Sequence, residues 1–355
     1  HILSVCRNLD TERFIPIVAA SPEGKFKELV LSTGVPFYDL NLPKFLGVNS
    51  LKKIDKLVNA ENINIIHAHG GVAGMYAGYY KRYLNSKIKT VHTIHGIHYI
   101  HSKSLFRKHF SMLIEKSLVN YYDSFICVSN DDYITAENLK LINPEKTSVI
   151  HNGIDLNRFA SVNMDNGFKY EFGITDSDFV IGNVSRFDEQ KNQSLLVKIM
   201  PALIKHIPSV KLLLVGDGEL LDSVKSLALK LKVDDNVIFA GARNDVDRFY
   251  HVFDVFAFPS LWEGLSLTLL ESLASGCAVI SSNIPANKEL ISHDVNGLLF
   301  DLNDENNLVE NILKLFNDRS LRIKLSDCAV ESSKIFDEKS MTRKIEFVYS
   351  KLINN

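Results

Sequence analysis

The sequence lacks the features that would place it at once in several protein classes. Its four cysteines, at positions 6, 127, 277 and 328, show neither paired nor metal-ligand spacing, so the pattern predicts reduced, buried thiols in a cytoplasmic protein. No apolar run reaches the roughly 18–20 residues that span a bilayer. Repeats and low-complexity segments are absent, which argues against solenoid and disordered classes.

Signatures of several enzyme classes are missing as well. The chain contains no HExxH or CxxC motif, no P-loop, no nucleophile elbow and no intact GxGxxG. Because a zinc site needs a defined set of ligands, we expect chemistry without a metal ion. No nucleic-acid partner is expected either.

What the chain does contain is an alternation typical of parallel α/β sheets. With 355 residues, 46% of them hydrophobic and 23% charged, it is long enough for two globular domains. Short β-branched runs alternate with segments of helical period. The expected strands are Ile15–Ala20, Val35–Leu40, Ile63–His67, Lys89–Thr93, Ser124–Val128 and Thr147–Ile150, then Phe179–Val184, Lys211–Val215, Val237–Ala240, Val255–Phe258, Ala278–Ser281 and Gly297–Phe300.

These two series of strands predict two Rossmann-like domains. The Asn152-Gly153 pair follows a strand and is typical of a turn or hinge, so we expect one domain in residues 1–152 and another in residues 153–336. A last helix, about 337–353, is expected to pack back on the first domain. Such domains open with a strand and a Gly-containing loop. His1–Leu9 resembles the end of a helix instead, so the first strand is expected to be missing from this chain.

Charge is unevenly distributed, although the net charge is only −2. Residues 1–152 carry 18 Lys and Arg against 13 Asp and Glu, and the remainder carries 22 against 29. Between Lys81 and Lys116, eight basic residues stand against one acid, Glu115. Such a stretch is typical of a face that meets anionic lipid or a phosphorylated substrate, and equally of an ordinary solvated surface.

The strongest functional signal is a pair of glutamates, Glu263 and Glu271, on either side of Gly264, Leu265 and Ser266. The segment follows an apolar strand and predicts a loop that leads into a helix. N–H groups at such a helix start attract phosphate, while the first carboxylate suits the hydroxyls of a sugar and the second suits a ribose diol. A surface acid pair would explain either glutamate alone, but it explains the glycine-containing loop between them poorly.

A second signal follows the strand that starts at Phe179. Arg186 is expected at the carboxyl end of that strand, and Lys191 in the loop that starts the next helix. Ligands of open α/β sheets bind at these ends, and two cations five residues apart can hold a diphosphate in place of a metal ion. A solvated surface pair is the alternative.

Other strand ends carry weaker signals. Gly216 belongs to a tight strand-to-helix turn, and Arg243 and Val246 follow the next strand, where they suit the lining of a nucleobase pocket. In the first half, His95 and the segment His67–Gly71 end two strands that are expected to be neighbours. Histidines there would face a cleft between the domains, although a lone histidine is more often structural.

Together these residues resemble the retaining glycosyltransferases of family 4. Glu263 and Glu271 match the family's paired-glutamate motif, with seven residues between the two acids, and Arg186 and Lys191 match its diphosphate-binding pair. His95 is similar to the family's acceptor-domain histidine near the donor sugar. The resemblance extends over nearly the whole chain.

The resemblance implies the GT-B fold, in which two Rossmann-like domains have parallel sheets that face each other across a cleft holding the active site. It also implies retaining transfer from a nucleotide sugar, usually a UDP-sugar. Glu271 would bind the ribose and Glu263 the sugar hydroxyls, while backbone N–H groups of Gly264 to Ser266 would hold the phosphate. Arg186 and Lys191 would stabilise the departing diphosphate, and no essential metal or other cofactor is implied.

The implied acceptor is a glycan, or one linked to a polyprenyl diphosphate, used in cell-surface polysaccharide synthesis at the inner face of the plasma membrane. The stretch Lys81 to Lys116 would then make a peripheral contact with the anionic membrane. Two alternatives stay open. One is a non-hydrolysing nucleotide-sugar 2-epimerase, which would form product without an acceptor, and the other is a non-catalytic bilobal protein that binds a sugar or nucleotide.

Overall fold

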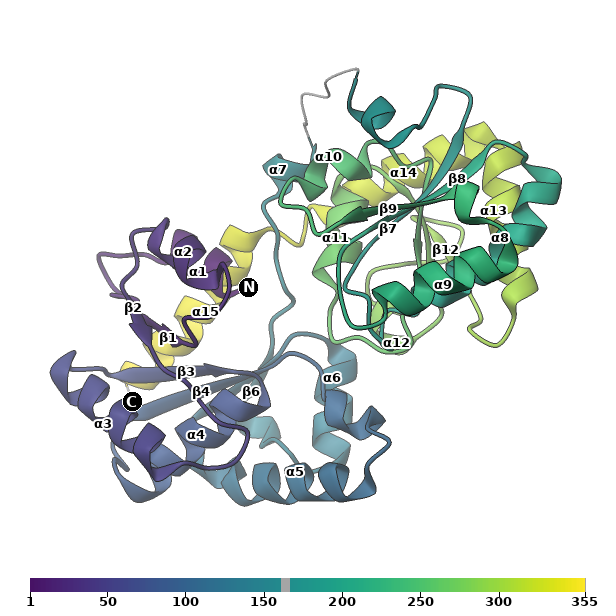
Figure 1. Ribbon diagram of the computed structural model, residues 1–355. Helices are drawn as coiled ribbons and strands as arrows, with labels where there is room; N and C mark the ends of the chain where they lie inside the picture. Colours follow the sequence, from purple (N-terminus) through teal and green to yellow (C-terminus); the bar gives the residue numbers. More distant parts are fainter. Residues whose placement is uncertain (161–166, 355) are drawn as a thin grey trace. The chain divides into compact units, whose positions relative to one another are not determined.

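The structure is a computed structural model that describes residues 1–160 and 167–354. The chain forms two compact units (Figure 1). The first unit contains His1–Gly153 together with the segment from Glu338 onward, and the second unit contains Ile154–Asp337. These boundaries lie one residue away from those expected at positions 152 and 336.

The strands of the first unit form two separate parallel sheets. One pairs β1 with β2, and the other has the order β3-β4-β5-β6. Their bounds are β1 Val18–Ala20, β2 Phe37–Asp39, β3 Ile65–His69, β4 Lys89–Ile94, β5 Ser124–Cys127 and β6 Thr147–Val149. β1 and β2 are shorter than expected because Pro16 and Pro36, which have no N–H group for a strand ladder, lie in the first halves of the expected ranges Ile15–Ala20 and Val35–Leu40.

Helices pack on the sheets of the first unit. They are α1 Ile2–Asn8, α2 Phe26–Leu31, α3 Val48–Ala60, α4 Gly70–Tyr83, α5 Leu105–Leu118, α6 Asn130–Asn138 and α15 Glu338–Ile353. α15 comes from the far end of the chain, yet its Met341 and Ile345 are buried with Val5 of α1 and Val91 of β4. The last helix therefore completes the core of the first unit.

The second unit has one six-stranded parallel sheet in the order β12-β11-β10-β7-β8-β9. Its strands are β7 Phe179–Val184, β8 Val210–Val215, β9 Val237–Gly241, β10 Val255–Phe258, β11 Ala278–Ser282 and β12 Leu298–Phe300. The chain runs outward from β7 through β8 to β9 and then returns to pair β10 with the other side of β7. This reversal creates a topological switch point between β7 and β10, the place where open α/β sheets bind ligands.

Helices surround this sheet (Figure 1), and both of its faces are buried. They are α7 Leu156–Ala160, α8 Gln193–His206, α9 Leu221–Leu231, α10 Val246–Tyr250, α11 Leu267–Ala274, α12 Pro285–Lys288, α13 Glu305–Asn317 and α14 Arg319–Ser333. Val255 and Ala257 of β10 join a cluster with helices α8, α9 and α13. Phe256 stacks on Phe258 and meets Tyr250 of α10, with ring centres 5.9 and 5.6 Å apart. Side chains alternate between the faces of a strand, so burial of both faces explains the continuous apolar runs of the sequence.

The described residues also bear on two expectations about what the chain lacks. Within residues 1–160 and 167–354, no helix is both long and apolar enough to cross a membrane. Cys6, Cys127 and Cys277 are buried free thiols, and Cys328 is a partly exposed one. Of the expected burial of all four cysteines, full burial holds for three.

Candidate functional site

Most of the site residues predicted in the second half of the chain lie on loops that leave the carboxyl ends of neighbouring strands, while Val246 and Glu271 lie in the helices α10 and α11. Arg186 and Lys191 follow β7, Gly216 follows β8, and Arg243 follows β9. The segment Glu263–Ser266 lies between β10 and α11. Because β7 and β10 are paired, the loops that carry Lys191 and Glu263 meet at the switch point.

Lys191 and Glu263 form an ion pair there. Lys191 Nζ lies 2.6 Å from Glu263 Oε1, and the two side chains are only 13% and 6% exposed. Gln190 Nε2 donates to Glu263 Oε2 at 3.1 Å and to the Trp262 carbonyl at 2.8 Å. Charge-assisted hydrogen bonds of this kind are stronger than neutral ones. The loop after β7 is thus fastened to the loop after β10 by the two side chains assigned to the diphosphate and to the sugar.

Arg186 differs from Lys191 because its side chain is 75% exposed. Its Nη2 lies 3.0 Å from Asp188 Oδ2, and an exposed pair of this kind is weak. The backbone below it is held firmly, since the buried Gln193 donates from Nε2 to the Arg186 carbonyl at 2.6 Å and to Ser185 Oγ at 2.8 Å. The guanidinium can turn toward an anion while its backbone stays fixed.

Gly216 allows two turns to pack backbone to backbone. The Ser185 amide donates to the Val215 carbonyl at 3.0 Å. A Cβ on Gly216 would lie 2.0 Å from the Ser185 carbonyl oxygen, and one on Gly218 would lie 2.5 Å from the Phe187 carbonyl oxygen. Only glycine fits at these two positions, so they hold the turn after β8 against the turn that carries Arg186.

Glu271 lies in α11, whose first residues continue the loop of Glu263. Ser266 caps this helix, with Oγ accepting from the Leu269 amide at 3.3 Å. Further along, the hydroxyl of the buried Tyr250 donates to Glu271 Oε2 at 2.8 Å. Burial raises the pKa of Glu271 to about 7, and the hydrogen bond from Tyr250 opposes that rise. The carboxyl group therefore changes charge near neutral pH while Tyr250 fixes its orientation.

Arg243 is anchored to the protein. Its Nε and Nη2 atoms donate to the two carboxylate oxygens of Asp245 at 2.9 and 2.8 Å. The guanidinium also lies 5.5 Å from the centre of the Phe249 ring. Val246 begins α10, the helix that also carries Tyr250. The Arg243 side chain is thus held in place beside α10. Its contact with a nucleobase stays a prediction.

His95 belongs to the first unit, so it is not among the residues that the second unit brings together. It follows β4, and its Nε2 lies 3.0 Å from Nδ1 of His69 at the end of β3. Burial lowers the pKa of His95 to about 3, so the ring is neutral at physiological pH. The ring of His1 meets it edge to face, with centres 4.9 Å apart. Contact between His95 and a donor sugar stays a prediction.

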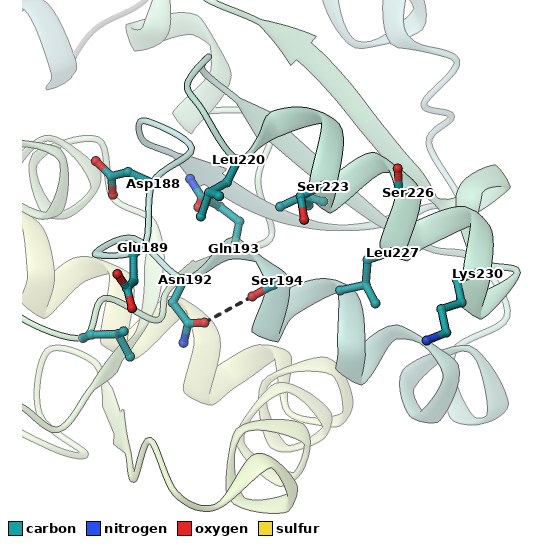
Figure 2. A pocket seen from close by; sticks show the side chains of 12 residues that line it. Asp188, Glu189, Asn192, Gln193, Ser194, Leu220, Ser223, Ser226, Leu227 and Lys230 are labelled. Atoms are coloured by element: carbon teal, nitrogen blue, oxygen red, sulfur yellow. Dashed lines mark hydrogen bonds between the residues drawn. The ribbon is translucent and has the colours of Figure 1, made fainter. Parts of the chain in front are cut away.

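A hollow of about 540 Å³ lies beside the Arg186 loop, between the start of α8 and helix α9 (Figure 2). Asp188 and Glu189 line it, with Lys230 at its far end. Two carboxylates and one cation do not suit a diphosphate. None of the predicted residues Arg186, Lys191, Glu263 and Glu271 lines this hollow. The candidate site is therefore the group of these side chains at the switch point, and the hollow is not part of it.

Sequence reasoning missed the residues that position the site. Gln190 lies between Arg186 and Lys191, and Gln193 lies two residues after Lys191, but nothing in the motif distinguished them from their neighbours. Tyr250 precedes Glu271 by 21 residues and belongs to another element, so no spacing rule connects the two. A polar or aromatic side chain that acts through another residue is recognised only once the contact is seen.

Two family models match the chain. Residues 1–158 match the model described as Glycosyltransferase Family 4, and residues 168–331 match the one described as Glycosyl transferases group 1. The chain is 28% identical over 325 residues to the UDP-Gal:alpha-D-GlcNAc-diphosphoundecaprenol alpha-1,3-galactosyltransferase of Escherichia coli, covering 90% of this chain and 84% of that protein.

Two further similarities extend this result. The N-acetylgalactosamine-N,N'-diacetylbacillosaminyl-diphospho-undecaprenol 4-alpha-N-acetylgalactosaminyltransferase of Campylobacter jejuni is 30% identical over 203 residues, 57% of this chain and 53% of that protein. The crystal structure of Anabaena Alr3699/HepE in complex with UDP and glucose has a TM-score of 0.85 at 22% identity, covering 99% of this chain and 95% of that one.

The two parallel α/β units and the matched models define a glycosyltransferase of the GT-B fold class. More narrowly, the chain contains a Glycosyltransferase Family 4 domain in its first half and a Glycosyl transferases group 1 domain in its second half. The resemblance seen in the sequence is confirmed, and the match favours the transferase over the epimerase and the non-catalytic binding protein.

Proposed function

We propose that the protein is a retaining glycosyltransferase that moves a sugar from a UDP-sugar to a glycan or a lipid-diphosphate-linked acceptor in cell-surface polysaccharide synthesis. The observation that carries the donor part is the meeting of Lys191 and Glu263 at the switch point, with Glu271 in the adjoining helix. The Escherichia coli relative is named for a UDP-sugar donor and an undecaprenol-diphosphate acceptor, and the Anabaena structure contains UDP. Both support the proposal.

In this proposal the donor lies along the loop from Glu263 to α11. The Glu271 carboxylate accepts hydrogen bonds from the ribose diol, with one of its oxygens already fixed by Tyr250. The start of α11 faces the diphosphate, where N–H groups and the helix dipole favour negative charge. Glu263 accepts from the sugar hydroxyls. Arg243 and Val246 flank the base, and Gly216 lets the turn after β8 come close to the nucleotide.

Arg186 and Lys191 stabilise the negative charge that develops on the departing diphosphate. Arg186 is free to leave the weak contact with Asp188, whereas Lys191 is already held in place by Glu263. A preorganised charge such as that of Lys191 supplies a large part of catalysis because it needs no reorganisation during the reaction. With two cations in this role we propose that no metal ion is required, so EDTA is expected to leave the transfer rate unchanged.

Retention is proposed to come from attack on the face that the diphosphate leaves. The acceptor oxygen bonds to the anomeric carbon while the bond from that carbon to the diphosphate oxygen breaks, and the acceptor proton passes to the departing phosphate oxygen. The neutral imidazole of His95 is proposed to orient the sugar. The alpha linkages in the names of both relatives support retention, because an alpha-linked UDP-sugar would keep its configuration.

The acceptor is proposed to be reached at the inner face of the plasma membrane through α5. Leu105, Phe106 and Leu113 are exposed on this helix, with Phe106 at 77%. Phe110 stacks on Phe106 and reaches Phe45, with ring centres 5.8 and 6.4 Å apart. Arg107, Lys108 and Lys116 belong to the same helical region. Exposed apolar residues among basic ones are typical of helices that lie in an anionic membrane surface.

The first experiment is a thermal-shift screen against UDP, GDP, ADP and CMP. A ligand that binds only the folded state raises the melting temperature by mass action. We expect a shift with UDP in the wild type and none in Glu271→Ala. UDP-sugars are then assayed with lipid-diphosphate-linked acceptors, and the configuration of the product is read by NMR. A UDP shift without transfer to any acceptor would contradict the transferase proposal, and an inverted product would contradict retention.

The membrane contact is tested separately by flotation with liposomes of anionic or neutral lipid. Binding to anionic liposomes that falls with added salt supports it, since screening weakens surface charge attraction. The absence of binding to anionic liposomes at low salt would overturn the proposed membrane contact and leave the proposed donor site unaffected.

A further inference from the structure

A histidine cluster in the first unit has a geometry that sugar transfer does not require. His1, His69 and His95 each offer one ring nitrogen, and the three nitrogens lie within 4.8 Å of one another. We propose that these three side chains form a binding site for a divalent transition-metal ion such as Zn²⁺, and that the bound ion inhibits sugar transfer.

The distances suit tetrahedral coordination with small side-chain movements. Zinc holds imidazole nitrogens at about 2.0 Å, so the ligand nitrogens of a tetrahedral site lie about 3.3 Å apart. His69 Nδ1 and His95 Nε2 are already 3.0 Å apart. The ring centre of His1 lies 5.3 Å from that of His69 and 4.9 Å from that of His95. Three imidazoles with the fourth position left to water form a common zinc coordination set.

The surroundings orient the proposed ligands. His1 Nδ1 lies 2.9 Å from Asn152 Oδ1. Donation to this amide oxygen places the proton on Nδ1 and leaves Nε2 as the metal-binding nitrogen, as outer partners of metal-bound histidines commonly do. The three rings come from the start of α1 and from the carboxyl ends of β3 and β4, and the pairing of β3 with β4 fixes the spacing of the last two.

His67 lies behind the three ligands rather than among them. Its ring packs on His69 with centres 4.2 Å apart. Its two nitrogens lie 2.5 Å from the hydroxyl of Tyr349 and 2.6 Å from Oγ1 of Thr93. Since protein groups already engage both nitrogens, His67 serves as a rigid support for His69.

Metal binding here needs a change of tautomer but no net loss of protons. A single proton lies in the hydrogen bond between His69 Nδ1 and His95 Nε2. For both nitrogens to bind the ion, that proton moves to the other nitrogen of the ring that carries it. Each imidazole stays neutral and donates one lone pair, which is the form that borderline metals such as Zn²⁺ and Co²⁺ accept.

The inhibitory effect rests on the proposed function, because it requires that His95 orient the donor sugar. An ion bound to Nε2 removes that nitrogen from the sugar and places a positive charge and a water molecule beside it. The binding of the ion does not rest on the proposed function and is measured without any substrate.

Binding is tested by titrating EDTA-treated protein with Co²⁺ and recording the visible spectrum. We expect saturation at one ion per chain with the absorption of a four-coordinate site, and without the thiolate charge-transfer band that a cysteine ligand would add. His69→Ala and His1→Gln should abolish saturable binding, while His109→Gln, an exposed histidine of α5, should leave it unchanged. Melting curves show whether each variant is folded.

Two outcomes would overturn the proposal. The absence of a saturable spectrum in the wild type would do so, and so would equal binding by wild type, His69→Ala and His1→Gln. In the transfer assay, Zn²⁺ should lower the rate and EDTA should restore it. Saturable binding with an unaffected transfer rate would support the metal site and contradict the proposed inhibition. If no transfer is found with any acceptor, the cobalt titration still decides on the metal site, so the two proposals fail separately.

Discussion

The two units contain the same kind of sheet but bury it to different degrees. In the second unit every residue of β7, β10 and β11 is buried. In the first unit β2 and β6 have no buried residue, and β3 has one. β3 carries His67 and His69 where β10 carries phenylalanine and alanine. The first unit also has apolar clusters around β4 and β5, so the difference lies in its less buried strands β2, β3 and β6, where polar side chains such as His67 and His69 take the place of apolar ones.

The difference teaches how each unit holds its functional groups. In the second unit the buried sheet fixes the loops, and the loops then hold charged groups such as Lys191 and Glu263 in nearly dry surroundings. In the first unit the strand residues themselves are the functional groups, and apolar side chains of α5 are left on the surface. Changes in the second unit should therefore affect catalysis and stability strongly, and changes in the first should affect contacts with partners.

The largest effect is expected at the Lys191–Glu263 pair. Glu263→Gln keeps the shape of the side chain but removes the charge that holds Lys191, and it replaces one of the two oxygens that accept from the sugar hydroxyls by an NH2 donor. We expect kcat/KM to fall about 10²- to 10³-fold, the range seen when one preorganised electrostatic group is lost. Glu189→Gln is the matched control, because Glu189 is an exposed acid on the loop that carries Lys191. Comparable activity in the two variants would refute the role of the pair.

The next effect is on stability and concerns the packing of β7. A Cβ on Gly182 would lie 2.2 Å from the ring of Phe253, which is buried among other aromatic rings. Gly182→Ala should lower the free energy of unfolding by about 3 kcal/mol through overpacking. Gly241→Ala should cost only about 1–2 kcal/mol, because its Cβ meets nothing within 4 Å and the penalty is its positive φ. Denaturant titration of both variants measures the difference. Equal losses of unfolding free energy would show that β7 and Phe253 can move to make room for the added methyl group.

A smaller effect is a pH dependence that separates two buried carboxyl groups. Burial raises the pKa of Glu271 in the second unit and of Glu115 in the first to about 7. Ribose hydroxyls donate to the ionised form, so UDP affinity should rise about tenfold between pH 6 and 8 as Glu271 loses its proton. Glu271→Gln should abolish this part of the dependence, and Glu115→Gln should keep it. Calorimetric titration at both pH values measures it.

The stability of the free protein should follow the opposite trend. A carboxyl whose folded pKa is raised binds its proton more tightly when folded, so its contribution is complete below pH 4.5 and is lost as pH rises through about 7. Wild type should therefore lose stability relative to Glu271→Gln over this window. If wild type and Glu271→Gln differ in melting temperature by the same amount at pH 5 and pH 8, the pKa of Glu271 is not raised.

The smallest effect is expected at the surface of α5. Phe106→Ser should weaken binding to anionic liposomes by about fivefold, because one partly inserted ring contributes roughly 1 kcal/mol. Ile323→Ser, an exposed apolar residue of α14 in the second unit, is the control and should leave binding unchanged. Flotation assays compare the two, and equal losses would contradict a docking face confined to the first unit.

Much of the fold was predictable because its signals are local. Each of the twelve expected strands is present, since β-branched runs bounded by turn residues depend on neighbours along the chain. β1 and β2 are each three residues shorter than expected, and theirs are the expected ranges that contain a proline without a hydrogen-bond donor. The separation of β1 and β2 from the other strands of the first unit was not predicted, because pairing depends on distant residues.

The candidate site was predictable in its parts and not in its contacts. The motif spacing placed Arg186, Lys191 and Glu263 on strand-to-helix connections at the carboxyl end of one sheet and Glu271 in the helix that follows, as the structure has them. The pairing of Lys191 with Glu263 joins residues 72 positions apart and follows from the adjacency of β7 and β10. No local pattern states which strands are neighbours.

The sequence by itself determined the class of fold, the family and the chemical groups that a sugar-nucleotide site needs, because each of these depends on residue type and spacing over short distances. Only the tertiary structure decided that Lys191 binds Glu263, that Tyr250 holds Glu271 and that His1, His69 and His95 meet. These contacts depend on strand order and on burial. Burial also sets the charge of Glu271 and His95 near neutral pH, because the cost of removing a charge from water is a property of the folded surroundings.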